Sequence, residues 1–287
     1  VSDDHKTWTF HIVDGVKFSN GDACDATAVA NSLNRLYTVC ATDAKSSTPE
    51  TYLAMESITA NADDNTVTIV TKEAYADLTS ILCFPFYEII DVQGDLTDAE
   101  HDYTADPTSV IGTGPYVIKS KDQTTKNSEL VKNENYWNGT PKIDELTIRT
   151  LSNGDTLSAA LQAGDIDAAY GMAYEAYPNF ENGNYQFSSI QTSRAFFGSM
   201  NMTGPIIQDA AVRRAIAMGI DKQGFVSALL DGHGVSGNGA FPDGFATFGG
   251  ENVTTETYDP EGAKAVLEAA GWIDSDGDGI REKDGVR

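Results

Sequence analysis

The sequence predicts an α/β fold of the mixed α+β type, built from several lobes. Patterns typical of strands and of helices intermix along the chain without the strict β-α-β order of a parallel sheet. With 287 residues, of which 40% are hydrophobic, the chain can bury a sizeable core and has the length of about two domains. Aromatic residues and apolar periodicity recur along the whole chain, which argues against disorder.

A β-hairpin is predicted at the start of the chain. Apolar and polar residues alternate over residues 7–12, and the Asp-Gly pair at residues 14–15 favours a turn. The alternation resumes over residues 16–18, and the Asn-Gly pair at residues 20–21 predicts a second turn. We therefore expect the first strand to pair with the segment that returns after the first turn.

A helix and a further strand are predicted next. Asp25 is a suitable N-cap, and Val29, Leu33 and Leu36 share one face at helical spacing. Residues 66–70 have the pattern of a strand. This part of the chain should therefore combine a small sheet with a helix.

The middle of the chain is predicted to contain further strands and one helix. The apolar stretch of residues 78–87 should begin as a helix, and the acidic, turn-rich stretch of residues 91–107 should be a boundary or crossover. Three strands are then predicted, near residues 116–119, 128–132 and 143–150. A helix is predicted over residues 155–163 with Gly164 as its C-cap, followed by a short buried strand over residues 166–170.

Three helices are predicted in the last part of the chain, and each begins at an aspartate. They cover residues 209–219, 222–230 and 259–270. The last has the clearest pattern, because Asp259 is a suitable N-cap, Pro260 takes the first helical position and Gly271 ends the helix.

The charge of the chain excludes two kinds of partner. The sequence holds 19 basic and 43 acidic residues, which gives a formal net charge of −24. A surface this acidic repels phosphate backbones and anionic lipids. We therefore expect no nucleic-acid partner and no membrane-surface partner. No apolar run approaches the roughly 18 residues that a membrane-spanning helix needs.

The sequence offers no recognisable catalytic constellation. The four histidines are scattered, and the chain contains no nucleophile elbow, phosphate-binding loop or zinc-protease motif. Gly232, Gly234 and Gly237 have the spacing of a dinucleotide fingerprint, but a predicted helix precedes them where a strand is needed. We predict no catalytic residue, no cofactor and no enzymatic activity. A hydrolase that uses paired acids is the alternative from another class.

The aspartates near the end of the chain form a candidate metal site. Asp274, Asp276 and Asp278 resemble the first half of a calcium-binding loop, but Gly285 stands where the loop needs its last carboxylate. A polar turn is the favoured interpretation, and a calcium-stabilised surface module is the alternative. The three cysteines, Cys24, Cys40 and Cys83, cannot all pair with one another, and either a Cys24–Cys40 disulfide or three thiols is possible.

Three ordered groups of motifs resemble the extracellular solute-binding proteins of the peptide/nickel class (family 5), which serve ABC importers. The first is TWTFHIVDGVKFSNGD at residues 7–22. The second comprises IGTGPY at 111–116, NENYWNG at 133–139 and AALQAGDID at 159–167. The third comprises VRRAI at 212–216, IDK at 220–222, YDP at 258–260, AAGW at 269–272 and DGDGIRE at 276–282. Each motif alone has little specificity, whereas their order and spacing are specific, and they extend over almost the whole chain.

The resemblance implies a periplasmic-binding-protein-like fold of type II, with two lobes around a cleft and an extra subdomain on one lobe. Residues 1–105 would be the extra subdomain, residues 106–190 part of the first lobe, and residues 191–287 the beginning of the second lobe. The chain would then be a fragment that lacks the N-terminal and C-terminal parts of such a protein, so that the second lobe is truncated.

The resemblance also implies a function. Members capture a small ligand, most often a di- or oligopeptide, by closing the two lobes, and deliver it to the membrane permease. A nickel chelate, haem or an oligosaccharide is the alternative ligand within the family. The protein would be a monomer outside the cytoplasm, either in a periplasm or as a cell-surface lipoprotein.

Six residues are candidate ligand contacts by their position in the family pattern. They are Thr113, Gly114, Tyr170, Met172, Phe197 and Asn201. Core packing or a role at a hinge is the alternative for each, and in particular for Met172 and Phe197.

Overall fold

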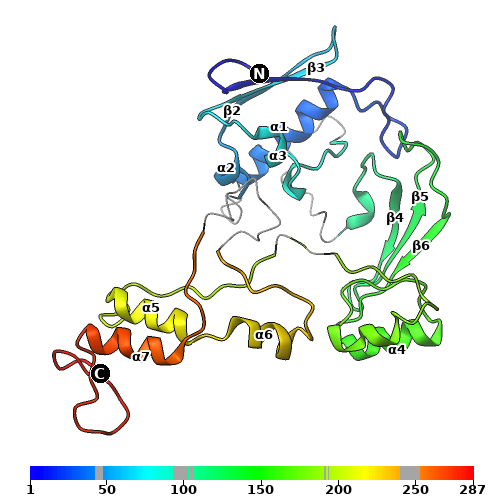
Figure 1. Ribbon diagram of the computed structural model, residues 1–287. Coiled ribbons are helices and arrows are strands. Elements are labelled where there is room, and N and C mark those ends of the chain that lie inside the picture. Colours follow the sequence, from blue (N-terminus) through cyan, green and yellow to red (C-terminus); the bar gives the residue numbers. More distant parts are fainter. Residues whose placement is uncertain (43–47, 93–102, 104–105, 191, 193, 240–252) are drawn as a thin grey trace. The chain divides into compact units, whose positions relative to one another are not determined.

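The computed structural model describes residues 1–42, 48–92, 103, 106–190, 192, 194–239 and 253–287 (Figure 1). The chain divides into two compact units, Val1–Thr150 and Leu151–Arg287, which we call unit 1 and unit 2. Both strands and helices are present, in the mixed order that the sequence predicts. The predicted division at residues 105 and 190 stays a prediction.

The first sheet of unit 1 is antiparallel and has the strand order β1-β3-β2. It consists of β1 (Thr7–His11), β2 (Met55–Asn61) and β3 (Thr66–Thr71). Strand β3 lies in the middle, and its apolar residues Val67 and Ile69 are each only 1% exposed. This alternation of buried and half-buried residues is typical of a strand with one face on a core.

The predicted pairing of the first hairpin is wrong, because β1 pairs with β3 and not with residues 16–18. The side chain of Asn65 holds the chain after β1: its Nδ2 donates to the Ile12 carbonyl at 2.9 Å and to Asp14 at 3.0 Å. Residues 16–18 instead pair with residues 22–24, through a bridge between Lys17 and Ala23. The β-branched and apolar residues of β3 offer β1 a longer partner than residues 16–18 can.

The helices of unit 1 complete its core. Helix α1 (Ala26–Thr42) begins at Asp25, whose carboxylate accepts the N–H of Ala28 at 2.9 Å, as predicted. The short helices α2 (Thr48–Tyr52), α3 (Leu78–Ile81) and the 3-10 helix η1 (Pro85–Tyr87) follow. The buried cluster that these elements share with the first sheet includes Leu33, Leu53, Ile58, Val67, Ile69, Leu78 and Tyr87.

A second antiparallel sheet in unit 1 contains the three strands that the sequence predicts. Its strands are β4 (Tyr116–Lys121), β5 (Ser128–Lys132) and β6 (Glu145–Ile148), in that order. The 3-10 helix η2 (Pro107–Ser109) precedes β4. An isolated β-bridge pairs Ile90, which follows η1, with Gly112, which precedes β4.

Unit 2 begins with α4 (Gly154–Ala163), which has the predicted left-handed C-cap at Gly164, with φ of 77°. The Asn153 side chain caps its N-terminus by accepting the N–H groups of Asp155 and Thr156. The buried strand predicted over residues 166–170 is wrong, because these residues form no strand and Tyr170 is fully exposed. The described residues of unit 2 include no strand with which this segment could pair. The 3-10 helix η3 (Tyr174–Asn179) follows.

The remaining helices of unit 2 have aspartate caps. They are α5 (Ala210–Gly219), α6 (Lys222–Leu229) and α7 (Pro260–Ala269). Asp221 and Asp259 each accept a backbone N–H of the first turn, as predicted, and Asp209, predicted as the first residue of its helix, is the cap of α5. Helices α5 and α7 lie side by side (Figure 1) and share a small core of Ala215, Met218 and Ala263. No helix in the described ranges is both long enough and apolar enough to cross a membrane.

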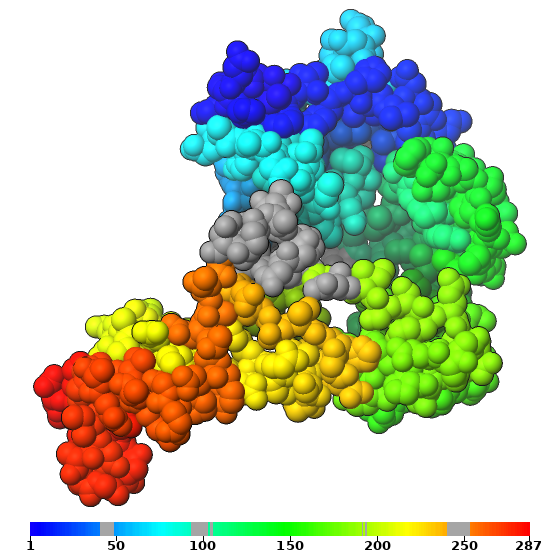
Figure 2. Space-filling view, in the orientation of Figure 1, coloured from blue at the N-terminus to red at the C-terminus, as the bar shows by residue number. Residues whose placement is uncertain are grey.

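The Asp209 carboxylate links three elements of unit 2. One oxygen accepts the cap bond from Ala211, at 2.9 Å, and the other accepts the indole N–H of Trp272 at 2.9 Å and the ammonium of Lys283 at 3.0 Å. The indole bond is the largest of the causes that lower the pKa of Asp209 from 3.8 to about 2. Trp272 is buried, so this carboxylate joins the start of α5 to the segment after α7. Figure 2 shows α7 and the C-terminal residues, in orange and red, as one continuous surface.

We expect Asp209→Asn to lower the Tm of unit 2 by about 3–6 °C at pH 7, because a charged acceptor of three hydrogen bonds is lost. The folded-state pKa lies below the ordinary value. The carboxylate therefore stabilises the fold fully above about pH 4, and this stabilisation is lost as the pH falls toward 2. Thermal melts at several pH values measure both effects.

The matched control is Asp167→Asn, which changes an exposed aspartate of the same unit. Asp209 would not have the role assigned to it if the Asp209→Asn and Asp167→Asn variants had the same Tm at pH 7. The same conclusion would follow if both variants lost equal stability between pH 4 and pH 2.

Candidate functional site

The loop of residues 111–115, which we call the IGTGP loop, contains two of the predicted ligand contacts. Its first half is held by main-chain hydrogen bonds. The N–H of Ser19 donates to the Gly112 carbonyl at 2.9 Å, and the N–H of Asp91 donates to the Ile111 carbonyl at 2.8 Å. Two segments that are distant in the sequence therefore fix this half of the loop.

The second half of the IGTGP loop is held by Asn133, which is only 2% exposed. Its Nδ2 donates to the Gly114 carbonyl and its N–H donates to the Pro115 carbonyl, both at 2.8 Å. Its Oδ1 accepts the N–H of Asn135 at 2.9 Å. A buried amide is costly unless it is paired, and the pairing here fixes the two carbonyls that flank the entry to β4.

Asn135 and Asn20 extend this network to the first motif of the sequence. The Asn135 Nδ2 donates to the Ser19 carbonyl at 3.2 Å, and the Asn20 Nδ2 donates to the carboxylate of Asp91 at 2.8 Å. The motifs at residues 7–22, 111–116 and 133–139 thus meet in unit 1.

The backbone of the IGTGP loop is accessible. Thr113 is half-buried and Gly114 is exposed. A Cβ atom added to Gly112 or Gly114 would meet no atom within 4 Å, and neither glycine has a left-handed backbone. Local sterics therefore do not require these glycines, and their lack of a side chain leaves the backbone of the loop uncovered.

The other four predicted contacts lie in unit 2. Tyr170 is 100% exposed and Phe197 is 75% exposed, while Met172 is half-buried. Asn201 is exposed, and its Oδ1 accepts the N–H of Thr203 at 3.1 Å. Among the described residues, no hydrogen bond or ring contact joins these four side chains to one another. The structure thus gives two groups of candidate residues, one in each unit.

Sequence reasoning missed a cluster of rings in unit 2. His233 stacks on Tyr174 with ring centroids 5.5 Å apart, and it lies 4.7 Å from the ring of Tyr177. Tyr177 also makes an edge contact with Phe187 at 4.8 Å. The histidine belongs to the glycine-rich loop after α6, where a helix precedes the glycines as predicted. The side chains that meet here come from distant segments, so no local pattern signals the cluster.

Sequence reasoning also passed over Phe196, the neighbour of Phe197. Its ring is 80% exposed, and the guanidinium of Arg194 lies 4.9 Å from its centroid. Two adjacent phenylalanines in the sequence were a usable signal for an exposed aromatic segment.

The aspartates of the candidate calcium loop lie close together. One ligand oxygen from each of Asp274, Asp276 and Asp278 lies within 4.8 Å of the others. The oxygens of Asp274 also accept N–H bonds from Gly277, Asp278 and Gly279, and the bond from Gly279 is the largest cause of its lowered pKa. This is the geometry of a turn that is closed by its own carboxylate. The structure thus agrees with the favoured interpretation as a polar turn, and calcium binding stays the alternative.

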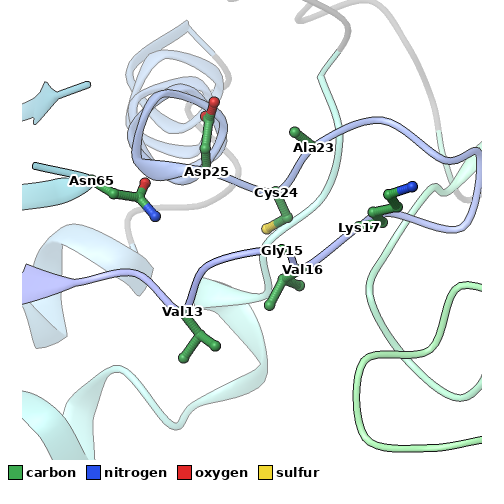
Figure 3. Close-up of a pocket in the computed structure, with 8 residues that line it drawn as sticks. All are labelled: Val13, Gly15, Val16, Lys17, Ala23, Cys24, Asp25 and Asn65. Carbon is green, nitrogen blue, oxygen red and sulfur yellow. The ribbon is translucent and has the colours of Figure 1, made fainter. Parts of the chain in front are cut away.

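A small pocket in unit 1 is lined by Val13, Gly15, Val16, Lys17, Ala23, Cys24, Asp25 and Asn65 (Figure 3). Its volume of about 110 Å³ is well below the several hundred Å³ of a typical ligand site. Cys24 lies in its wall, and burial raises the pKa of its thiol to about 11. Cys24, Cys40 and Cys83 are all free thiols in the structure. This pocket therefore has the character of a packing gap.

Comparison with known proteins identifies the family to which the chain belongs. The family model described as "Bacterial extracellular solute-binding proteins, family 5 Middle" matches residues 1–286. The chain belongs to this family. The resemblance inferred from the sequence motifs is thereby confirmed.

Two curated relatives show how much of such a protein the chain represents. It is 30% identical to the nickel-binding periplasmic protein of Escherichia coli K12, over 99% of this chain and 54% of the relative. It is 29% identical to the glutathione-binding protein GsiB of Salmonella paratyphi A, over 96% of this chain and 52% of the relative. The chain thus spans about half the length of the curated relatives it matches.

Two solved structures confirm the predicted fold class. The crystal structure of NikA from Brucella suis in complex with Fe(III)-EDTA has a TM-score of 0.78 and 25% identity, and the match covers 99% of this chain and 56% of NikA. The oligopeptide-binding protein AppA from Bacillus subtilis, in complex with a nonapeptide, has a TM-score of 0.69 and 26% identity. That match covers 99% of this chain and 56% of AppA.

We expect Asn133→Ala to reduce the free energy of unfolding by about 1–3 kcal/mol, because the Gly114 carbonyl and the Asn135 N–H both lose a buried partner. Urea unfolding of the protein measures this change. Asn138→Ala is the control, since Asn138 is an exposed asparagine of the same motif. Equal midpoints for the two variants would show that the buried amide does not hold the loop.

Proposed function

We propose that this chain is part of the solute-binding component of an ABC importer. The complete protein would capture a small ligand between two lobes and deliver it to the membrane permease. The observation that carries this proposal is the match of the family model to residues 1–286. The relatives are named for the solutes that they bind, which supports a role in binding and not in catalysis.

A di- or oligopeptide is the ligand that we propose. The similar proteins bind glutathione, which is itself a tripeptide, and a nonapeptide. The relative named for nickel supports a nickel chelate as the alternative. Haem or an oligosaccharide is a further alternative ligand.

The proposed ligand contacts are Thr113 and Gly114 in unit 1 and Tyr170, Met172, Phe197 and Asn201 in unit 2. The firmly held and accessible backbone of the IGTGP loop supports the first two, because a rigid site loses little entropy when it binds. Main-chain groups there suit the amides of a peptide. The exposed rings of Tyr170 and Phe197 support contacts to an apolar part of the ligand.

The proposed mechanism is capture by closure. A ligand that contacts residues of both lobes favours the closed arrangement, and the permease distinguishes this arrangement from the open one. We propose residues 1–105 as the extra subdomain, residues 106–190 as part of the first lobe and residues 191–287 as the beginning of the second.

The family is described as extracellular. We propose that the complete protein is a monomer that works in a periplasm or on the cell surface as a lipoprotein, with the permease subunits as its partners and no nucleic-acid partner.

Isothermal calorimetry of the full-length protein with a mixture of di- to pentapeptides should give stoichiometric heat. We expect Gly114→Val and Phe197→Ala each to weaken binding by about 5- to 30-fold. The first places a side chain, for which there is local space, over the main chain that the peptide would contact, and the second removes an exposed ring. Phe225→Ala is the control, since Phe225 is an exposed phenylalanine of α6 and is 59% exposed.

If nickel–histidine gave binding heat and no peptide did, the nickel chelate and not a peptide would be the ligand. Peptide binding that neither variant weakens would refute the assigned contacts.

A further inference from the structure

Three aromatic side chains form an exposed patch in unit 1. Tyr52, Phe84 and Phe86 are 46%, 42% and 39% exposed. Their ring centroids are 5.1 Å apart for Tyr52 and Phe84, and 5.9 Å apart for each of the other two pairs. The interplanar angles of 16° to 27° make all three rings nearly parallel. We call these three residues the aromatic patch.

The aromatic patch is supported by buried groups. Tyr87, which is 4% exposed, makes an edge contact with Phe86 at 6.3 Å, and its hydroxyl donates to the Pro49 carbonyl at 2.8 Å. The N–H of the fully buried Leu53 donates to the same carbonyl at 2.9 Å. Pro85, between the two phenylalanines, fixes its own backbone torsion. The rings are therefore held in place before any ligand arrives.

Exposed apolar side chains that gather in one place are a feature of many interaction sites. The faces of aromatic rings carry negative charge density and attract cations, and a guanidinium stacks well on them. The described residues include such contacts: the guanidinium of Arg35 lies 4.9 Å from the ring centroid of Tyr103, and the guanidinium of Arg194 lies 4.9 Å from that of Phe196. The ammonium of Lys283 lies 5.9 Å from the ring centroid of Trp272.

Two acidic side chains lie within two residues of the aromatic patch in the sequence, and one of them is left to attract a cation, because the other already forms an ion pair. Glu50 precedes Tyr52 by two residues in α2, and its carboxylate pairs with Lys72 at 2.7 Å. Glu88 follows Phe86 by two residues and is exposed. In the described part of the chain, no cation forms a salt bridge with it. With a formal net charge of −24, the chain as a whole also attracts cations.

We propose that the aromatic patch binds the guanidinium or ammonium group of an arginine or lysine side chain in a peptide, and so makes the protein prefer cationic peptides. This inference rests on the proposed function as a peptide-binding protein. It assigns the patch a partner by complementary charge and by the chemistry of the ring faces.

The test compares two peptides, Ala-Arg-Ala-Ala and Ala-Gln-Ala-Ala, on the full-length protein by calorimetry. We expect the arginine peptide to bind about five-fold more tightly. The double variant Phe84→Leu/Phe86→Leu keeps apolar side chains but removes two rings. It should abolish this preference and change the affinity for the glutamine peptide less than two-fold. Phe225→Leu is the control and should keep the preference. Equal affinities in the wild type, or a preference that persists in the double variant, would overturn the inference.

A second measurement separates failure of the patch from failure of the proposed function. The full-length protein is labelled with fluorophenylalanine, and its ¹⁹F signals from Phe84 and Phe86 are assigned with the two leucine variants. N-acetyl-arginine amide should shift both signals, whereas N-acetyl-glutamine amide should not. Shifts without any peptide binding would refute the peptide function and retain the cation site. Peptide binding without shifts would refute the cation site alone.

Discussion

The hydrogen bonds of the buried Asn133 side chain hold together the segments of unit 1 that meet at the IGTGP loop. The side chain donates to the Gly114 carbonyl and accepts from the N–H of Asn135, so one amide fixes both the IGTGP loop and the turn that follows β5. An aspartate lacks the donor, and a leucine lacks both donor and acceptor. Because Asn135 in turn bonds to Ser19, the network reaches the beginning of the chain. Segments that are far apart in the sequence are thus held at one place, and the accessible backbone of Thr113 and Gly114 is presented there.

Unit 2 has an anchor of a different kind, the charged carboxylate of Asp209. It serves as the cap of α5 and as the acceptor for Trp272 and Lys283, so the helix and the C-terminal segment share one group. Exposed rings at Tyr170 and Phe197 stand in the same unit.

Local features of the fold were predictable from the sequence, and long-range features were not. The caps at Asp25, Asp221 and Asp259 depend on residues within one helical turn, so the pattern predicts them correctly. The pairing of β1 depends on Asn65 and on the buried residues of β3, which a local reading of residues 7–18 does not include. The apolar segment of residues 166–170 resembles a strand, but unit 2 gives it no strand partner in the described ranges. At the candidate site, the motif pointed to Thr113 and Gly114. The aromatic patch brings Tyr52 together with Phe84 and Phe86 from another segment, and no local pattern contains that information.

We propose that the IGTGP loop is an anchored surface for the main chain of a bound peptide. A crystal structure of the full-length protein grown with a bound peptide tests it most directly. We expect backbone atoms of the peptide to lie within hydrogen-bonding distance of Thr113 or Gly114, and we expect Asn133 to keep its bond to the Gly114 carbonyl. A peptide bound in the protein without contact to residues 111–115 would contradict the proposed role of the IGTGP loop.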